Sequence, residues 1–144
     1  MEKKVIIVGA GLVGSLWAIY LSNAGYKVTI YERRSDIRKA EISAGKSINL
    51  ALSNRGWKAL EGAGVAKEVK KIAYPMHSRI MHDKEGNLTS QAYGKKDQAI
   101  YSVSRGHLNS IMMSMAEEKG NATIWHTLYL EYSVSSYEDN NHKD

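Results

Sequence analysis

Three glycines near the start of the chain have the spacing that holds the phosphates of a dinucleotide. Gly9, Gly11 and Gly14 form the pattern G-x-G-x-x-G. The first glycine permits a tight turn, the second lets the backbone approach a pyrophosphate, and the third lets a helix pack closely on the preceding strand. Glu32 follows 18 residues after Gly14, near the separation at which a carboxylate meets a ribose hydroxyl. The chemistry indicated is the binding of a dinucleotide.

The elements that would position these residues are a strand, a helix and a second strand. The apolar run at residues 5–8 predicts a strand buried on both faces. Residues 12–24 predict a helix whose N-terminus favours an anion, and residues 27–31 predict a strand that ends beside Glu32. This unit leaves open whether the dinucleotide is a flavin or a nicotinamide. Glu32 argues against a 2′-phosphate, because two anions would meet there.

The rest of the chain predicts alternating strands and helices. Ser53 and Ser104 stand where they would cap two helices, and the second helix has apolar residues at i, i+3, i+4, i+7 and i+8 from Leu108. Its methionines are read as core residues. The expected strands are residues 47–52, 99–103 and 122–125, and the expected helices are residues 54–61, 66–72 and 105–119.

A β-hairpin is predicted around the turn at residues 83–87, which contains a glycine. If His82 pairs with Leu88, then Arg79 faces Gln91. Arg79 and Tyr93 then lie on one face of the hairpin as diagonal neighbours.

Composition narrows the possible functions. The chain has 144 residues, 43% apolar and 24% charged, which suits one domain with a modest core. Without cysteine it forms no disulfide and has no thiol catalysis, and we expect a cytoplasmic protein without a signal peptide or transmembrane segment. The net charge of +5 is scattered, so no nucleic-acid partner is expected. We assign no catalytic residue and no metal site, since the five histidines do not group.

Longer stretches distinguish between the two dinucleotides. "GAGLVGSLWAIYL", "YERR", "GKSINLALSNRGWKAL", "PMHSRIMHD" and "AIYSVSRGHLN" occur in this order. Over about residues 4 to 124 the chain resembles the kynurenine 3-monooxygenases, which are FAD-dependent aromatic hydroxylases. The resemblance implies the N-terminal portion of an α/β, Rossmann-like FAD-binding domain of the aromatic-hydroxylase type, with a β-hairpin insertion at about residues 76–94.

The resemblance also implies an activity and a set of contacts. The activity is hydroxylation of L-kynurenine to 3-hydroxykynurenine with FAD, NADPH and O2, a step of tryptophan catabolism on the route to quinolinate and NAD. Arg79 matches the arginine that holds the kynurenine carboxylate, and Tyr93 matches a tyrosine that contacts the substrate. The residues implied to contact FAD are Gly9, Gly11, Leu12, Val13, Gly14, Tyr31, Glu32, Arg33, Arg34, Ala51 and Arg105.

The last part of the chain departs from the family pattern. Residues 125–144 form an atypical acidic tail, residues 1–124 form the partial FAD-binding domain, and the chain contains no Gly-Asp pair, which the family has further along. An alternative interpretation is therefore a truncated, catalytically inactive FAD-binding fragment. A sheet without its later strands would expose edges, which favours self-association.

Overall fold

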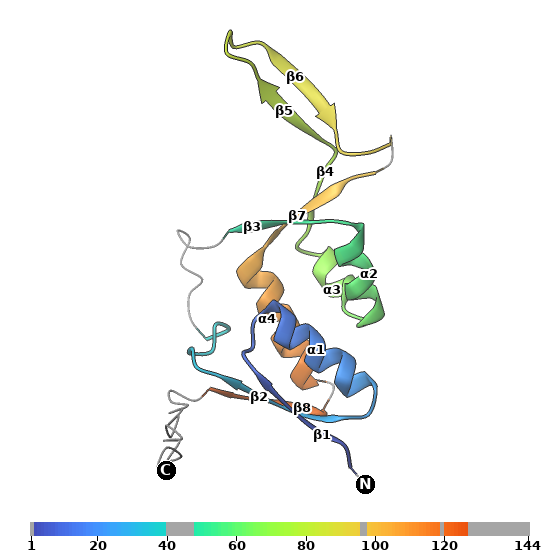
Figure 1. Ribbon diagram of the computed structural model, residues 1–144, viewed down its shortest axis with the longest axis vertical. Helices are drawn as coiled ribbons and strands as arrows, with labels where there is room; N and C mark the ends of the chain where they lie inside the picture. Colours follow the sequence, from blue (N-terminus) through green and yellow to red (C-terminus); the bar gives the residue numbers. More distant parts are fainter. Residues whose placement is uncertain (1, 40–47, 96–97, 119, 127–144) are drawn as a thin grey trace, which may run out of the picture.

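The computed structural model describes residues 2–39, 48–95, 98–118 and 120–126, which form four helices and eight strands (Figure 1). The helices are α1 (Leu12–Asn23), α2 (Asn54–Gly62), α3 (Ala66–Lys70) and α4 (Arg105–Glu118). The strands are β1 (Lys4–Val8), β2 (Lys27–Glu32), β3 (Asn49–Leu52), β4 (Tyr74–Met76), β5 (Ser78–His82), β6 (Leu88–Ala92), β7 (Ile100–Ser104) and β8 (Ala122–His126). Each element predicted from the sequence is present, with ends that differ by a few residues.

A parallel sheet forms the base of the molecule. Its strand order is β1-β2-β8, with Val5 opposite Val28 and Val28 opposite Ala122. Helices α1 and α4 lie side by side on the same side of this sheet (Figure 1). The predicted strand–helix–strand unit is thus confirmed, and the glycine turn lies at the carboxyl end of β1, where parallel sheets bind ligands.

Strand β1 differs from its prediction, because it is not buried on both faces. Ile7 faces the helices, while Ile6 and Val8 are 68% and 73% exposed. Across the sheet, Val8 of β1 pairs with Tyr31 of β2, and Tyr31 pairs with Trp125 of β8. Trp125 is 55% exposed. We call Ile6, Val8 and Trp125 the open sheet face. Among the described residues no helix covers this face and β1 is an edge strand, so Ile6 and Val8 remain in water.

The core lies between the sheet and helices α1 and α4. Ile19 of α1 and Ile30 of β2 are fully buried, and the apolar stripe predicted for α4 is buried or partly buried. Helix α4 buries a second row as well, because Asn109 and Met113 are 7% and 1% exposed. The interpretation of the methionines as core residues is confirmed for Met112 and Met113.

The two serine caps have different outcomes. The Ser104 hydroxyl accepts a hydrogen bond from the His107 amide at 3.4 Å, as a cap requires. Ser53 occupies the N-cap position of α2, but its side chain makes no capping hydrogen bond. The expectation of a side-chain cap at Ser53 was therefore wrong, although the helix begins where predicted.

The upper part of the molecule contains an antiparallel sheet and a hairpin. The sheet has the order β3-β7-β4, and the hairpin pairs β5 with β6. His82 lies opposite Leu88 and Arg79 opposite Gln91, so the predicted register is confirmed. All residues of both hairpin strands are exposed, and the hairpin extends away from the body of the molecule (Figure 1).

Candidate functional site

The glycine turn has the backbone that a phosphate site requires. Gly9 has a φ of +99°, a conformation that residues with a side chain rarely adopt, and its amide donates to the Tyr31 carbonyl at 2.8 Å. A Cβ on Gly14 would lie 1.9 Å from the Gly9 oxygen, so only glycine lets α1 approach β1 this closely. A Cβ on Gly11 would meet nothing within 4 Å. The space beside Gly11 is therefore open to a ligand.

The N-terminus of α1 has no side-chain cap. Gly11 is the N-cap residue, and within the described ranges the helix has no side-chain capping hydrogen bond. Amide groups in the first turn of a helix lack partners within the helix, and the helix dipole favours an anion beside them. Leu12 and Val13, the first two residues of α1, present their amides at this end, and the Val13 side chain is 72% exposed. The turn fits a pyrophosphate.

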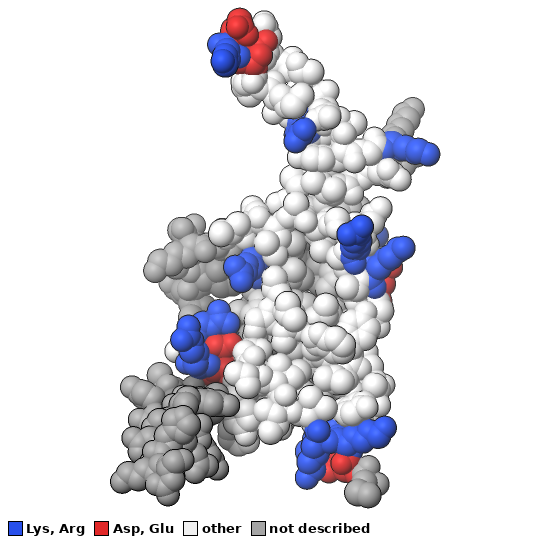
Figure 2. Space-filling model, in the orientation of Figure 1, with Lys and Arg blue, Asp and Glu red and all other residues white. Residues whose placement is uncertain are grey.

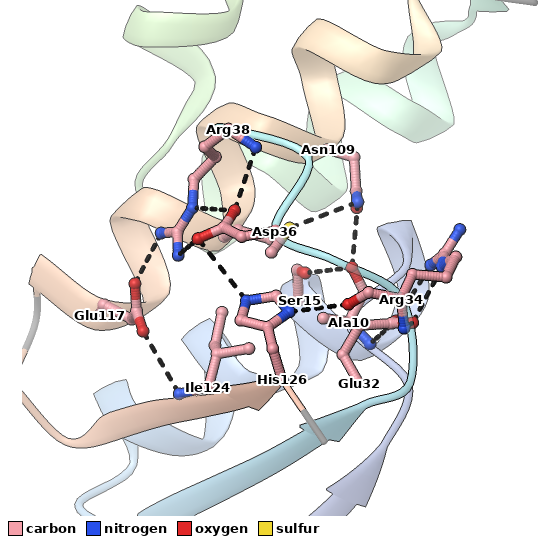
Figure 3. A network of polar contacts seen from close by, with 11 residues as sticks. Ala10, Ser15, Glu32, Arg34, Asp36, Arg38, Asn109, Glu117, Ile124 and His126 are labelled. Carbon is pink, nitrogen blue, oxygen red and sulfur yellow. Dashed lines mark hydrogen bonds and ion pairs between the residues drawn. The ribbon is translucent and has the colours of Figure 1, made fainter. Parts of the chain in front are cut away.

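Ala10, between the first two glycines, is held by three side chains that come from three elements (Figure 3). Its amide donates to Glu32 Oε2 at 2.8 Å. Its carbonyl oxygen accepts hydrogen bonds from Ser15 Oγ at 3.2 Å and from Asn109 Nδ2 at 3.0 Å. Ala10 is 1% exposed, so these contacts are shielded from water. The conformation of the turn thus depends on β2, α1 and α4 together.

Glu32 is the acid predicted at the end of β2, and it is 5% exposed. Arg34 approaches its carboxylate with three donors: the amide at 2.9 Å, Nε at 2.8 Å and Nη2 at 3.0 Å. Hydrogen bonds from the Arg34 side chain, with smaller contributions from the amides of Arg34 and Ala10, lower the pKa of Glu32 to about 2 although burial opposes the shift. The carboxylate is therefore ionised at neutral pH.

A second polar network lies beside the first, where β8 ends (Figure 3). Arg38 joins Asp36 through Nε and Nη2, at 2.8 and 2.7 Å, and reaches Glu117 of α4 at 2.6 Å. His126 lies 3.6 Å from Asp36 and 2.9 Å from the Arg34 carbonyl oxygen. Hydrogen bonds from Arg38 hold the pKa of Asp36 well below its usual range. This network, which the sequence analysis did not foresee, fastens the segment after β2 to α4 and β8.

Four other residues predicted to contact FAD lie outside the glycine turn: in β2, just after β2, in β3 and at the start of α4. Tyr31 supports the turn through its carbonyl oxygen, and Arg33 is exposed just after β2. Arg105 begins α4, one helical turn before Asn109, and is exposed. Ala51 lies in β3 opposite Ser102 of β7, and it is also exposed. The structure thus gathers the residues of the phosphate side around Ala10, and it places Ala51 and Arg105 in the neighbouring sheet and at the start of α4.

The predicted substrate residues lie on the hairpin. Arg79 Nε donates to Gln91 Oε1 at 2.7 Å, and the Tyr93 amide donates to the His77 carbonyl oxygen at 2.9 Å. The alternation of the strands therefore puts Arg79 and Tyr93 on one face, as predicted. Tyr93, 40% exposed, lines a hollow of about 430 Å³ whose other walls include Arg55 and Ile100. Arg79 is not among the residues that line this hollow.

Charged side chains do not form one continuous patch on the face that Figure 2 shows. Lysine and arginine side chains gather in several separate groups there, some of them beside acidic residues (Figure 2). Within the described ranges no helix is long and apolar enough to cross a membrane. In the same residues, no group of three or more histidine and acidic side chains is arranged to hold a metal ion.

A parallel strand–helix–strand unit with an open glycine turn and a buried acid after its second strand defines a dinucleotide-binding domain. Residues 2–140 match the model of the FAD binding domain family, so the chain belongs to that family and FAD is its cofactor. The match extends past residue 124 into the segment predicted to be a separate tail. The domain boundary at residue 124 stays a prediction.

The curated relatives are much longer than this chain. It is 52% identical over 119 residues to the kynurenine 3-monooxygenase of Christiangramia forsetii, which covers 83% of this chain and 26% of that protein. It is 55% identical over 119 residues to the kynurenine 3-monooxygenase of Flavobacterium johnsoniae, which covers 81% of this chain and 26% of that protein. The Caenorhabditis elegans enzyme of the same name is 44% identical over 123 residues, with 85% and 27% covered. The chain thus spans about a quarter of the length of these relatives.

Solved structures show the same fold at lower identity. The p-nitrophenol 4-monooxygenase of Pseudomonas putida superposes with a TM-score of 0.69 at 20% identity, over 88% of this chain and 32% of that one. A 2-methyl-3-hydroxypyridine-5-carboxylic acid oxygenase superposes with a TM-score of 0.67 at 19% identity, over 85% of this chain and 31% of that one. The fold is the Rossmann-like fold of FAD-dependent monooxygenases, as the sequence predicted.

Proposed function

We propose that this chain binds the ADP half of FAD on the glycine turn and is the cofactor-binding part of a kynurenine 3-monooxygenase. The observation that carries the proposal is the uncapped N-terminus of α1 beside an open Gly11, with Glu32 buried next to it. The amides of the turn and of the first turn of α1 would face the pyrophosphate. Tyr31, through its carbonyl oxygen, holds the turn in place.

Glu32 would accept hydrogen bonds from the hydroxyl groups of the adenosine ribose. Its two oxygens already accept four hydrogen bonds, one from the Ala10 amide and three from Arg34. A carboxylate has about four acceptor positions, so a ribose hydroxyl would have to displace the Arg34 guanidinium. The Arg34 side chain is 58% exposed, and on turning outward it would join Arg33 beside the adenine. Ala51 and Arg105 would contact the flavin side of the cofactor.

The test of the FAD site is a substitution that spares the fold. Gly11 has a φ of −75° and a ψ of −178°, which any residue adopts, and a Cβ there meets nothing. Gly11→Val should therefore leave thermal unfolding unchanged and abolish FAD binding in a fluorescence titration, because the side chain fills the place of the pyrophosphate. Gly14→Ala is the contrasting control, since its Cβ clashes with the Gly9 oxygen and should destabilise the fold. A Gly11→Val chain that binds FAD as tightly as the parent would refute the site.

The proposed reaction is hydroxylation of L-kynurenine at ring position 3 with NADPH and O2. FAD, when bound, supplies the redox chemistry that activates O2. The chain contributes Arg79 and Tyr93, on one face of the hairpin. Arg79 has no carboxylate partner within the described residues, so its planar guanidinium is available to bond both oxygens of the kynurenine carboxylate. The alternative is that the chain is an inactive FAD-binding fragment. Such a fragment would bind FAD equally well in the titration but would form no 3-hydroxykynurenine.

We further propose a cytoplasmic location and self-association of this chain. A chain without cysteine suits a reducing compartment, and fractionation of cells that express it tests the location. Self-association would use the open sheet face and the edge of β1, since exposed apolar surface next to an unpaired strand favours pairing with another copy.

A further inference from the structure

The peptide that joins Ala10 to Gly11 is oriented by buried side chains. A trans peptide is planar, and its carbonyl oxygen and its amide hydrogen point in opposite directions. Ser15 and Asn109 hold the Ala10 carbonyl oxygen inside the molecule. The Gly11 amide must then point the other way, out of the core. The space beside Gly11 is open, so this amide is presented to a ligand at the N-terminus of α1.

We propose that Asn109 is a positioning residue of the FAD site, which keeps the Gly11 amide turned toward the pyrophosphate. This inference rests on the proposed function, because it assigns the open side of the turn to the FAD phosphates. Asn109 itself touches no phosphate. It acts through the Ala10 carbonyl oxygen, 99 residues away along the chain, and Ser15 is its partner in the same role.

The cost of burying Asn109 supports a specific role. Its side chain lies in the second buried row of α4, one helical turn before Met113, where an apolar side chain would avoid the burial of polar atoms. Asn109 Oδ1 is buried and has no hydrogen-bond partner within the described residues. Leaving a buried acceptor unpaired costs about 1–3 kcal/mol. The bond from Nδ2 to Ala10 is the contribution that offsets this cost, and it fixes the glycine turn.

The same helix joins the two ends of the proposed cofactor site. Arg105 precedes Asn109 by four residues, so both lie on one side of α4. Arg105 is proposed to contact the flavin side, and Asn109 sets the turn on the phosphate side. A rigid helix thus keeps the phosphate turn in register with the flavin contact.

The test compares four variants of the full 144-residue chain by titration with FAD and with ADP. Asn109→Leu and Ser15→Ala each remove one donor to Ala10, and each should weaken both ligands about three- to tenfold. The affinity of the double variant should fall by more than the product of the two single fold-losses. Only in the double variant do both side-chain donors to the Ala10 carbonyl oxygen disappear. Ser110→Ala is the matched control. Its hydroxyl on the same helix is buried and has no partner in the described part of the chain, so affinity should not change.

A second measurement separates positioning from general loss of stability and needs no cofactor. Hydrogen exchange of the Ala10 amide, which is bonded to Glu32 Oε2, should be about tenfold faster in Asn109→Leu than in the parent. Amides in β2 should exchange at the parental rate. If the Ala10 amide keeps the parental exchange rate, the proposed role of Asn109 is wrong. It is also wrong if Asn109→Leu and Ser15→Ala both bind FAD and ADP as the parent does. A parent chain that binds no FAD refutes the proposed function, while the exchange rates still decide the role of Asn109.

Discussion

Glu32 combines two tasks in one buried carboxylate. One oxygen fixes the Ala10 amide of the glycine turn, and both oxygens bind Arg34. The charge is stable in this place because every nearby donor is an amide or a guanidinium, which stabilises the ionised form. The acid proposed to bind the ribose therefore also supports the phosphate turn. Loss of its charge should affect the fold even without cofactor.

The stability of the chain should depend on Glu32 in acid. Its pKa is about 2 in the folded chain against a usual value of 4.5, so protons bind the unfolded chain more readily. The stabilisation is complete above about pH 4.5 and is lost as the pH falls toward 2. It amounts to about 1–3 kcal/mol, where the lower value allows for solvent screening of the exposed Arg34.

Denaturant unfolding across this pH range gives the measurement. The free energy of unfolding of the parent should fall more steeply in acid than that of Glu32→Gln. Both proteins contain Asp36, so subtracting one curve from the other cancels the contribution of Asp36. Glu61→Gln, at an exposed position of α2, is the control for a change of net charge. Parallel curves for the parent and Glu32→Gln would contradict the assigned hydrogen bonds.

At the scale of elements, the sequence predicted what depends on local pattern. The turn at residues 83–87 determined the register of the hairpin, and the spacing from Leu108 determined the buried side of α4. Asn109 was missed because a polar residue interrupts an apolar row and carries no local signal of its contact with Ala10, 99 residues away. The position of Asn109 four residues before Met113, a methionine already expected in the core, was the one available hint.

The hairpin is the element on which substrate recognition can be tested without disturbing the fold. Arg79→Ala should weaken kynurenine binding by roughly 1.5–3 kcal/mol, the range for hydrogen bonds to charged groups, and leave FAD affinity unchanged. The measurement uses a chimera in which residues 1–124 replace the matching part of the Flavobacterium johnsoniae relative.

Leu88→Ala is the matched control for Arg79→Ala, because Leu88 is 64% exposed on the opposite face of the hairpin. It should bind kynurenine as the parent chimera does. If Arg79→Ala weakens FAD and kynurenine equally, the hairpin supports the fold of the chimera instead, and the assignment of Arg79 to the carboxylate is withdrawn.

At the scale of the whole molecule, the parallel sheet has one open side. The sequence predicted β1 as fully buried, because its apolar run is what a central strand would have. Local pattern does not reveal whether a covering layer is present, and the described residues leave Ile6, Val8 and Trp125 in water. An open apolar face of this kind lowers solubility and favours contact with another copy.

Self-association should therefore depend on the open sheet face. Sedimentation at several concentrations should show the parent as a dimer or larger species, and Ile6→Thr/Val8→Thr should shift it toward monomer. Ile80→Thr is the control, since Ile80 is 65% exposed but lies on the hairpin. FAD affinity should be the same in all three proteins. A parent that stays monomeric at every concentration would contradict this prediction.

The last prediction concerns the reaction of this chain alone. Hydroxylation by a flavin needs a site that excludes water, because an accessible site releases hydrogen peroxide instead of product. Every residue of both hairpin strands is exposed, Tyr93 is 40% exposed, and the chain spans about a quarter of its relatives. With FAD, NADPH, O2 and kynurenine supplied, we expect NADPH consumption to yield peroxide and little 3-hydroxykynurenine. We expect the chimera to reverse that ratio, because it restores the three quarters of the relative that this chain does not span. Stoichiometric hydroxylation by the 144-residue chain would show that it, or an oligomer of it, completes a closed site.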